Sequence, residues 1–285
     1  MAMVPESRGE ITLKNIGKSY GPQRFATHVV RDCSFTAPAG QFTVMIGPSG
    51  VGKSTLIRLI AGFEKPTSGE ILIDGRPVTG PGPDRQVMFQ ETALFPWMTA
   101  EDNILFGPRA RGEDRAQNGR LADFLLEKVG LRAFRKHFPG QLSGGMQRRA
   151  ELARALINNP DVMILDEPFR GLDAMSKKLM LDYYARLSAE QSRTNLFITT
   201  DIDEAIFLAD RLLVMSHIPT RVRAVIEVDL PRPRQFAALF RDPRANRIKI
   251  EALSLLHEEA MKGFAGGSKA ASDFIEAYRR RVAAH

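Results

Sequence analysis

Apolar runs and helical patterns alternate along most of the chain. Residues 10–20 alternate apolar and polar positions, and residues 41–47 form an almost continuous apolar run that ends at a glycine, so both predict strands. Apolar runs at 71–75, 162–168 and 195–201 predict three more strands. Strands that are apolar throughout and alternate with helices are typical of a parallel sheet covered on both faces. The pattern therefore predicts an α/β fold.

Helical spacing of apolar residues fills the segments between these strands. A glycine-rich loop follows the strand at 41–47, and the helix after it has a predicted apolar face of Leu56, Leu59, Ile60 and Phe63. The pattern is helical again between 97 and 140, with a predicted apolar face of Leu121, Phe124, Leu125, Val129 and Leu131. A further helix is expected from 142 to 160. These helices predict an insertion between two halves of the sheet.

The pattern changes after residue 231. A PRPR segment precedes two predicted helices, which are separated by the glycine-rich sequence KGFAGGSK. We interpret that sequence as a hinge or linker.

Composition narrows the class of protein. The chain has 285 residues and 44% hydrophobic residues, enough for a packed core. Its longest apolar stretches are far shorter than the roughly 20 residues of a membrane-spanning helix. The N-terminus has no secretory pattern, so we expect a cytosolic protein. The single cysteine, Cys33, is expected to be a buried thiol.

The sequence GPSGVGKS at 47–54 fits the phosphate-binding pattern G-x-x-x-x-G-K-[ST], between a predicted strand and a predicted helix. Loop amides and the positive helix end bind phosphate oxygens, Lys53 reaches the β- and γ-phosphates, and Ser54 ligates Mg²⁺. The alternative is a glycine-rich turn with an incidental lysine. The predicted nucleotide-binding residues here are Gly47, Pro48, Ser49, Gly50, Val51, Gly52, Lys53, Ser54 and Thr55.

Two adjacent carboxylates end a predicted buried strand. Asp166 and Glu167 follow the run VMIL, where a carboxylate is costly unless it meets a cation. Asp166 can hold Mg²⁺, and Glu167 can polarise an attacking water molecule. The alternative role for this pair is a helix N-cap.

The sequence LSGGMQRRAELARAL at 142–156 opens a predicted helix with a serine and two glycines. Ser143 and the amides of Gly144 and Gly145 form a second anion site there. Because the chain already has one phosphate-binding loop, a second site suggests a second molecule. This sequence closely resembles the signature of the ATP-binding-cassette (ABC) ATPase family.

The resemblance covers about residues 11–216 and implies a P-loop ABC cassette. It implies a RecA-like parallel-sheet core, an N-terminal antiparallel β portion and a helical subdomain at about 91–158. We expect residues 1–230 to form the cassette and 231–285 a C-terminal helical extension. ATP and Mg²⁺ are the implied cofactors, and two cassettes are expected to close head to tail over ATP.

The resemblance also implies roles for single residues outside the phosphate loop. Tyr20 resembles the aromatic residue that stacks on adenine, with a core tyrosine as the alternative. Gln90 resembles the glutamine that contacts Mg²⁺ and water, and Asp173 the residue that crosses the dimer interface. Gln147 is expected beside the signature at the nucleotide.

The chain departs from the family pattern at two positions. Thr200 occupies the place of the usual histidine that contacts the γ-phosphate, and Arg170 replaces the usual glycine or serine. A lost transition-state contact typically costs about 2.7–4 kcal/mol. We predict that Thr200 is catalytic together with Glu167 and Gln90. Because threonine lacks the imidazole, we expect slow ATP hydrolysis unless a water molecule or another group replaces it. We interpret Arg170 as a surface arginine.

A single cassette is typical of importers, and segments 82–107 and 201–216 look most like the nitrate/sulfonate/taurine importer group. The implied partners are a membrane permease and an extracytoplasmic substrate-binding protein, with this chain peripheral on the cytoplasmic face of the inner membrane. Phe95, Trp97 and Met98 are expected in the groove that receives the permease, with core packing as the alternative.

Two alternatives to the importer remain. Thr200 is compatible with a hydrolysis-weak regulatory subunit paired with a competent homologue. The net charge is +7, and the stretch from Pro219 contains 13 Lys and Arg residues and 8 Asp and Glu residues. This positive charge is compatible with a role in nucleic-acid binding. A basic surface beside anionic lipid or a permease loop explains this charge as well, so we expect no nucleic-acid partner.

Overall fold

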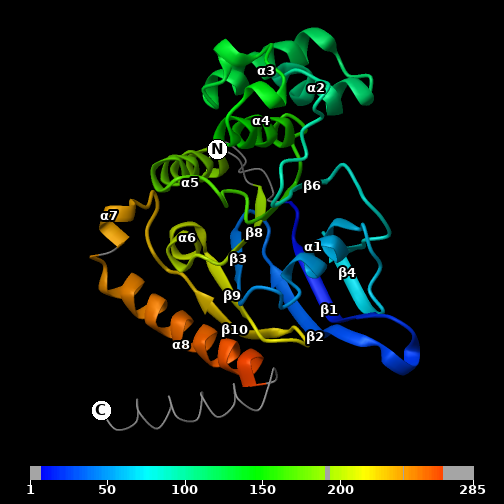
Figure 1. Ribbon diagram of the computed structural model, residues 1–285, viewed down its shortest axis with the longest axis vertical. Helices are drawn as coiled ribbons and strands as arrows, with labels where there is room; N and C mark the ends of the chain where they lie inside the picture. Colours follow the sequence, from blue (N-terminus) through cyan, green and yellow to red (C-terminus); the bar gives the residue numbers. More distant parts are fainter. Residues whose placement is uncertain (1–7, 190–192, 240, 266–285) are drawn as a thin grey trace, which may run out of the picture.

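The computed structural model describes residues 8–189, 193–239 and 241–265. Within these residues the strands form one sheet of six and one of four, and helices cover both the large sheet and one end of the molecule (Figure 1). The mixed α/β architecture confirms the predicted fold class.

The large sheet has the strand order β10-β9-β3-β8-β7-β6. All neighbouring pairs are parallel except β10 with β9. The buried strands β3, β7 and β8 are the continuous apolar runs of the sequence, as expected for a sheet covered on both faces. The strands are β3 (Phe42–Ile46), β6 (Arg85–Met88), β7 (Val162–Asp166), β8 (Thr194–Thr199), β9 (Arg211–Met215) and β10 (Val222–Glu227).

The small sheet is antiparallel, in the order β2-β1-β4-β5. It comprises β1 (Ile11–Tyr20), β2 (Thr27–Ala37), β4 (Ser68–Ile73) and β5 (Arg76–Pro77), with a 3₁₀ turn at Gln23–Phe25. Helix α1 (Lys53–Ala61) lies between the two sheets, and its Leu56 and Ile60 are fully buried with residues of both. Cys33 is buried in the same cluster, which confirms the prediction of a buried thiol.

Helix α1 is shorter than its sequence pattern predicted. It ends at Ala61 because Gly62, with φ of 81°, forms its C-cap and accepts the left-handed conformation. Phe63 therefore lies outside the helix, is 50% exposed, and stacks against Phe89 with ring centroids 5.9 Å apart. The prediction of Phe63 on the buried helix face was wrong.

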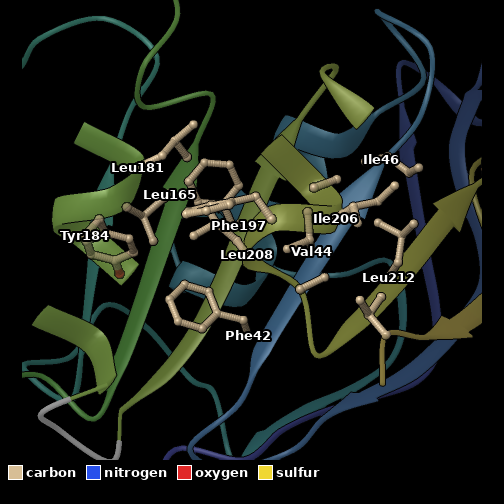
Figure 2. Close-up of a cluster of buried hydrophobic side chains, with 14 of the residues drawn as sticks. Phe42, Val44, Ile46, Leu165, Leu181, Tyr184, Phe197, Ile206, Leu208 and Leu212 are labelled. Carbon is tan, nitrogen blue, oxygen red and sulfur yellow. The ribbon is translucent and has the colours of Figure 1, made fainter. Parts of the chain in front are cut away.

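The opposite face of the large sheet is covered by α5 (Ala174–Ala189), α6 (Ile202–Leu208) and α8 (Pro243–Ala265). Figure 2 shows how Leu181 and Tyr184 of α5 point toward Phe42 and Phe197 of the sheet. The rings of Phe42 and Tyr184 meet edge to face, 5.9 Å apart. Apolar side chains thus fill the space between these helices and the sheet.

A layer of helices is inserted between β6 and β7, as the sequence predicted. It contains α2 (Ala100–Ala110), α3 (Arg115–Lys128) and α4 (Gly144–Leu156), with 3₁₀ turns at Arg132–Phe134 and Pro139–Gln141. The buried residues of α3 are Ala122, Leu125 and Leu126, whereas Leu121 and Phe124 are 37% and 49% exposed. The predicted apolar face was therefore wrong at Leu121 and Phe124 and right at Leu125, Val129 and Leu131.

The segment after β10 packs on the cassette core. The short helix α7 (Phe236–Leu239) stacks Phe236 on Phe207 of α6, with ring centroids 4.0 Å apart. Helix α8 continues to Ala265, so the predicted linker KGFAGGSK is helical over its first four residues, and that part of the prediction was wrong. The second predicted tail helix lies outside the described residues. No helix in the described part of the chain is long and apolar enough to span a membrane.

Candidate functional site

The phosphate-binding loop connects β3 to α1, in the strand–loop–helix arrangement that the sequence predicted. Gly52 has φ of 101°, and a Cβ atom there would lie 2.8 Å from Cγ1 of Val29. A Cβ on Gly47 would lie 3.0 Å from Cβ of Met215. Glycine at 52 therefore suits both the left-handed conformation and the narrow space beside β2, whereas at 47 only the closeness of β9 favours glycine.

Lys53 begins helix α1 and is 6% exposed. Its Nζ donates to the carbonyl oxygens of Gly47 at 2.8 Å and of Pro48 at 2.7 Å. Burial lowers the pKa of Lys53, while the charges of Glu167 and Asp166 act in the opposite direction. The ammonium group is thereby held inside the curve of the loop, where a phosphate would meet it.

Ser54 and Asp166 are joined directly. Ser54 Oγ donates to Oδ2 of Asp166 at 2.9 Å, which links α1 to the end of β7. Asp166 is 7% exposed, and burial raises its pKa, opposed by the Ser54 hydrogen bond. A hydroxyl and a carboxylate are hard oxygen donors that suit Mg²⁺. The described residues contain no group of three or more His, Cys, Asp or Glu side chains able to hold a metal ion.

Glu167, Gln90 and Thr200 lie at one edge of the large sheet. Each follows the carboxyl end of one of three neighbouring parallel strands, β7, β6 and β8. The side chain of Glu167 is 13% exposed, and its backbone N–H donates to Ile198 of β8 at 2.9 Å. Gln90 and Thr200 are both exposed. The structure therefore brings together the three residues predicted to be catalytic, beside Asp166.

Tyr20 ends β1 close to the start of α1. Its hydroxyl donates to Oε2 of Glu64 at 2.7 Å and lies next to Thr55. Burial and the Glu64 hydrogen bond raise the pKa of Tyr20. The residue is 39% exposed, and the Lys18 ammonium lies 5.0 Å from the ring centroid. The ring is thus not a core tyrosine and remains accessible beside the phosphate loop.

The signature residues lie on the helical layer. Ser143 caps α4 by accepting a hydrogen bond from the N–H of Met146 at 3.3 Å, and Gly144 and Gly145 open the helix. In the described part of the chain, no hydrogen bond joins Ser143, Gly144 or Gly145 to the phosphate loop of the same subunit. Figure 1 shows α4 in the helical layer, away from α1, so the two predicted anion-binding segments lie in different parts of the chain.

Two predicted residues near the signature are already engaged in the subunit. Gln147 donates to the carbonyls of Pro139 and Leu142, at 2.9 and 3.2 Å, and accepts from Thr92. Asp173 accepts from the backbone N–H groups at 175 and 176 in the first turn of α5, and hydrogen bonds from the side chain and backbone of Ser176 lower its pKa. Gln147 thus ties the signature to the segment after Gln90, and its predicted contact with nucleotide stays a prediction.

Sequence reasoning missed the group that connects the signature helix to the Gln90 segment. Arg148 of α4 is 5% exposed, donates to the carbonyl of Phe89 at 2.7 Å, and pairs with Glu151 at 2.9 Å. Glu151 is also buried, which raises its pKa, and it accepts from the N–H of Ala93. The signal in the sequence is charge at positions of α4 where the helix is otherwise buried.

The arrangement of loop, helix and neighbouring strand carboxylates defines a P-loop nucleotide-binding protein. The "ABC transporter" family model matches residues 30–170. The chain is 41% identical over 245 residues to the nitrate import ATP-binding protein NrtD of Synechococcus elongatus, covering 85% of this chain and 89% of that protein. It is 40% identical to the aliphatic sulfonates import ATP-binding protein SsuB of Bacillus licheniformis, covering 76% and 84%. The chain belongs to the ABC transporter family and is an ATP-binding subunit.

A solved structure shares the fold. It is a dimeric post-hydrolysis state of the ATP-binding cassette MJ0796 bound to ADP and Pi, with a TM-score of 0.70 and 27% sequence identity. The similarity covers 78% of this chain and all of that chain. The predicted cassette fold is thereby confirmed.

Proposed function

We propose that this chain is the ATP-hydrolysing subunit of an importer for a small solute of the nitrate, sulfonate or taurine class. The observation that carries the proposal is the Ser54–Asp166 contact at 2.9 Å, with Glu167 beside it, in a chain 41% identical to a nitrate import subunit over most of its length. Positioned carboxylates at a phosphate loop are the arrangement that phosphoryl-transfer enzymes use.

The roles within the site follow from position and chemistry. The loop amides and Lys53 bind the phosphates, and the exposed ring of Tyr20 stacks on adenine. Ser54 and Asp166, with Gln90, would hold Mg²⁺, which supplies charge neutralisation for the transferring phosphoryl group. Glu167 accepts a hydrogen bond from the attacking water and so orients it.

The second anion site supports a dimer. Ser143 and Gly144 at the start of α4 are exposed, so they are available to the nucleotide of a second cassette. The similar cassette MJ0796 is dimeric in its solved structure. ATP held between two such surfaces favours the closed pair, and hydrolysis removes that preference.

An aromatic cluster is the proposed contact for the permease. Phe95 lies 5.5 Å from Trp97 and 4.6 Å from Phe106 between ring centroids, and Arg154 lies 5.4 Å from the Phe95 ring. Trp97 is 69% exposed, so the cluster offers an apolar surface next to the Gln90 segment. Met98 is half-buried beside it.

Docking on a membrane permease would determine where this chain lies in the cell and which other proteins it works with. The chain would lie peripherally on the cytoplasmic face of the inner membrane, and an extracytoplasmic protein would deliver the solute to the permease. We keep the cassette at residues 1–230, with its helical subdomain at about 91–158, and the extension at 231–285, because the chain from Pro231 folds back on α6 after the last strand.

Steady-state ATP turnover of the purified protein tests the enzymatic part. Turnover should require Mg²⁺ and be lost with EDTA, and Glu167→Gln should lower it at least about a hundredfold while ATP still binds. Glu113→Gln, at an exposed ion pair with Arg111, is the matched control. Full turnover by Glu167→Gln would refute the assignment of Glu167.

Transport tests the importer part. Reconstitution with a candidate permease should give ATP-dependent uptake of nitrate, a sulfonate or taurine into vesicles, and Trp97→Ala should reduce complex formation without reducing ATP binding. Intact complexes with Trp97→Ala would exclude the aromatic cluster as the docking surface.

A further inference from the structure

The guanidinium of Arg170 contacts the carboxylate of Glu167. Nη1 of Arg170 donates to Oε2 of Glu167 at 3.1 Å. The side chain of Arg170 is 60% exposed, whereas that of Glu167 is 13% exposed. The sequence alone identifies Arg170 only as a surface arginine, and the structure gives it a specific partner at the edge of the site.

The backbone around this pair is fixed at several points. The N–H of Glu167 donates to Ile198 at 2.9 Å, and the N–H of Arg170 donates to the carbonyl of Glu167 at 3.1 Å, which closes a turn. Phe169, between them, is 1% exposed in the core. Because Cα positions 167 and 170 are set by these contacts, the side-chain pairing depends only on rotation of the two side chains.

Arg170 binds only one of the two carboxylate oxygens of Glu167, Oε2. Among the described residues, the side chain of Glu167 has a single hydrogen-bond partner, at Oε2. A glutamate has several rotatable bonds, and ordering it at the moment of reaction costs conformational entropy. A cationic donor that holds one oxygen restricts the orientation of the other, which can then accept from water.

Arg170 is expected to affect Glu167 more by restricting its side-chain orientation than by the attraction between their charges. An ion pair whose cation is largely exposed is screened by solvent and contributes little to binding or stability. Arg170 therefore influences Glu167 mainly by restricting its rotamer.

We propose that Arg170 is a positioning residue for ATP hydrolysis, which holds Oε2 of Glu167 so that Oε1 is presented to the attacking water. This inference rests on the proposed function of Glu167. In this role Arg170 contacts neither the nucleotide nor the water. Its replacement should therefore lower kcat without weakening nucleotide binding.

Steady-state kinetics of Arg170→Ala and Arg170→Lys test the proposal. Arg170→Ala should lower kcat by up to about tenfold, because the Glu167 rotamer must then be ordered during the reaction. The KM for ATP and the affinity for a fluorescent ATP analogue should stay within twofold. Arg170→Lys, which keeps a donor and the charge, should recover most of the kcat. Arg186→Ala, at an exposed ion pair with Asp182 on α5, is the matched control for loss of a surface arginine.

Measurements in the Glu167→Gln variant distinguish the positioning role of Arg170 from the catalytic role of Glu167. Arg170→Ala should not lower the residual rate of Glu167→Gln further, since the residue it positions is already gone. A parent-like or raised kcat in Arg170→Ala, with Glu167→Gln inactive, overturns the role of Arg170 alone. An equal loss in both backgrounds also overturns it, because Arg170 would then act without Glu167. Near-parent turnover by Glu167→Gln overturns the proposed function of Glu167, and this inference with it.

Discussion

Lys177 of α5 donates to the carboxylate of Glu204 of α6, with Nζ 2.7 Å from Oε1. Lys177 also lies 3.5 Å from Asp201, and the other oxygen of Glu204 accepts from Thr199 at 2.7 Å. Glu204 is 6% exposed, and these two partners compensate the burial of its carboxylate. The residues on both sides of Thr200 are thus anchored, while the Thr200 side chain is exposed at the site.

Removing Lys177 should destabilise the protein through Glu204. Lys177→Met leaves a buried carboxylate with a hydroxyl partner only, and we expect a loss of about 1–3 kcal/mol in the free energy of unfolding, measured by urea denaturation. Adding Glu204→Gln to that variant removes the uncompensated charge and should recover part of the loss. A double variant that is no more stable than Lys177→Met would show that the ion pair is not the source.

Restoring an imidazole at residue 200 should speed hydrolysis. Thr200 is exposed beside Glu167, and a threonine hydroxyl cannot carry positive charge toward the transferring phosphoryl group. Thr200→His should raise ATP turnover at least about tenfold, whereas Thr200→Gln, similar in size but uncharged, should not. An unchanged rate in Thr200→His would mean that the missing contact is compensated, and would remove the reason for a hydrolysis-weak regulatory subunit.

The sequence was most informative where local pattern and burial agree. The runs that became β3, β7 and β8 are apolar at nearly every position because both sheet faces are covered, and such runs have few alternatives. The site residues at their carboxyl ends could be placed together because neighbouring parallel strands end at one edge.

The errors arose where an apolar residue satisfied more than one pattern. Phe63 continues the helical spacing of α1, but the left-handed cap at Gly62 ends the helix first. Leu121 and Phe124 lie one position from the face of α3 that packs, which only the neighbouring helices decide.

The side-chain partners of the site could not be predicted from the sequence. The Arg170–Glu167 contact depends on the turn that follows β7 and on the rotamers of two long side chains. The pairing of Arg148 with the carbonyl of Phe89 joins residues 59 positions apart through the packing of the helical layer. Neither leaves a periodic signal in the chain.

Cys33 should be inert in the native protein and should make stability depend on pH in alkaline solution. Burial raises the pKa of its thiol to about 12, whereas an unfolded thiol ionises near pH 8.5. Between these values the unfolded state has lost the proton and the folded state has kept it. Stability should therefore fall as pH rises, by up to about 1.4 kcal/mol per pH unit from this group.

Thiol labelling and denaturation measure this effect. A chromogenic disulfide reagent at pH 8 should react with Cys33 only after urea unfolds the chain, and Cys33→Ala should have a shallower loss of stability between pH 9 and 10 than the parent. Rapid labelling of the native protein would place the thiol at the surface.

Arg234 should be essential for packing the C-terminal extension. Its side chain is 2% exposed and donates to five backbone carbonyls, at Ile206, Phe207, Ala209, Val228 and Leu230. Burial lowers its pKa to about 10, so the guanidinium stays charged at neutral pH. Arg234→Met removes a donor from these carbonyls, of which Val228 keeps the N–H of Leu230, and should cost about 2–4 kcal/mol, a fall in Tm of roughly 5–15 °C by calorimetry. Arg234→Lys should recover little of the lost stability, because three donors on a single nitrogen cannot reproduce the planar guanidinium.

The control is Arg241→Ala, at an exposed arginine, which should change Tm by less than about 2 °C. A melting curve of Arg234→Met that matches the Arg241→Ala control would show that water replaces the guanidinium, and that other contacts, such as the Phe236–Phe207 stacking and the Lys249–Asp203 ion pair, are enough to hold α7 and α8.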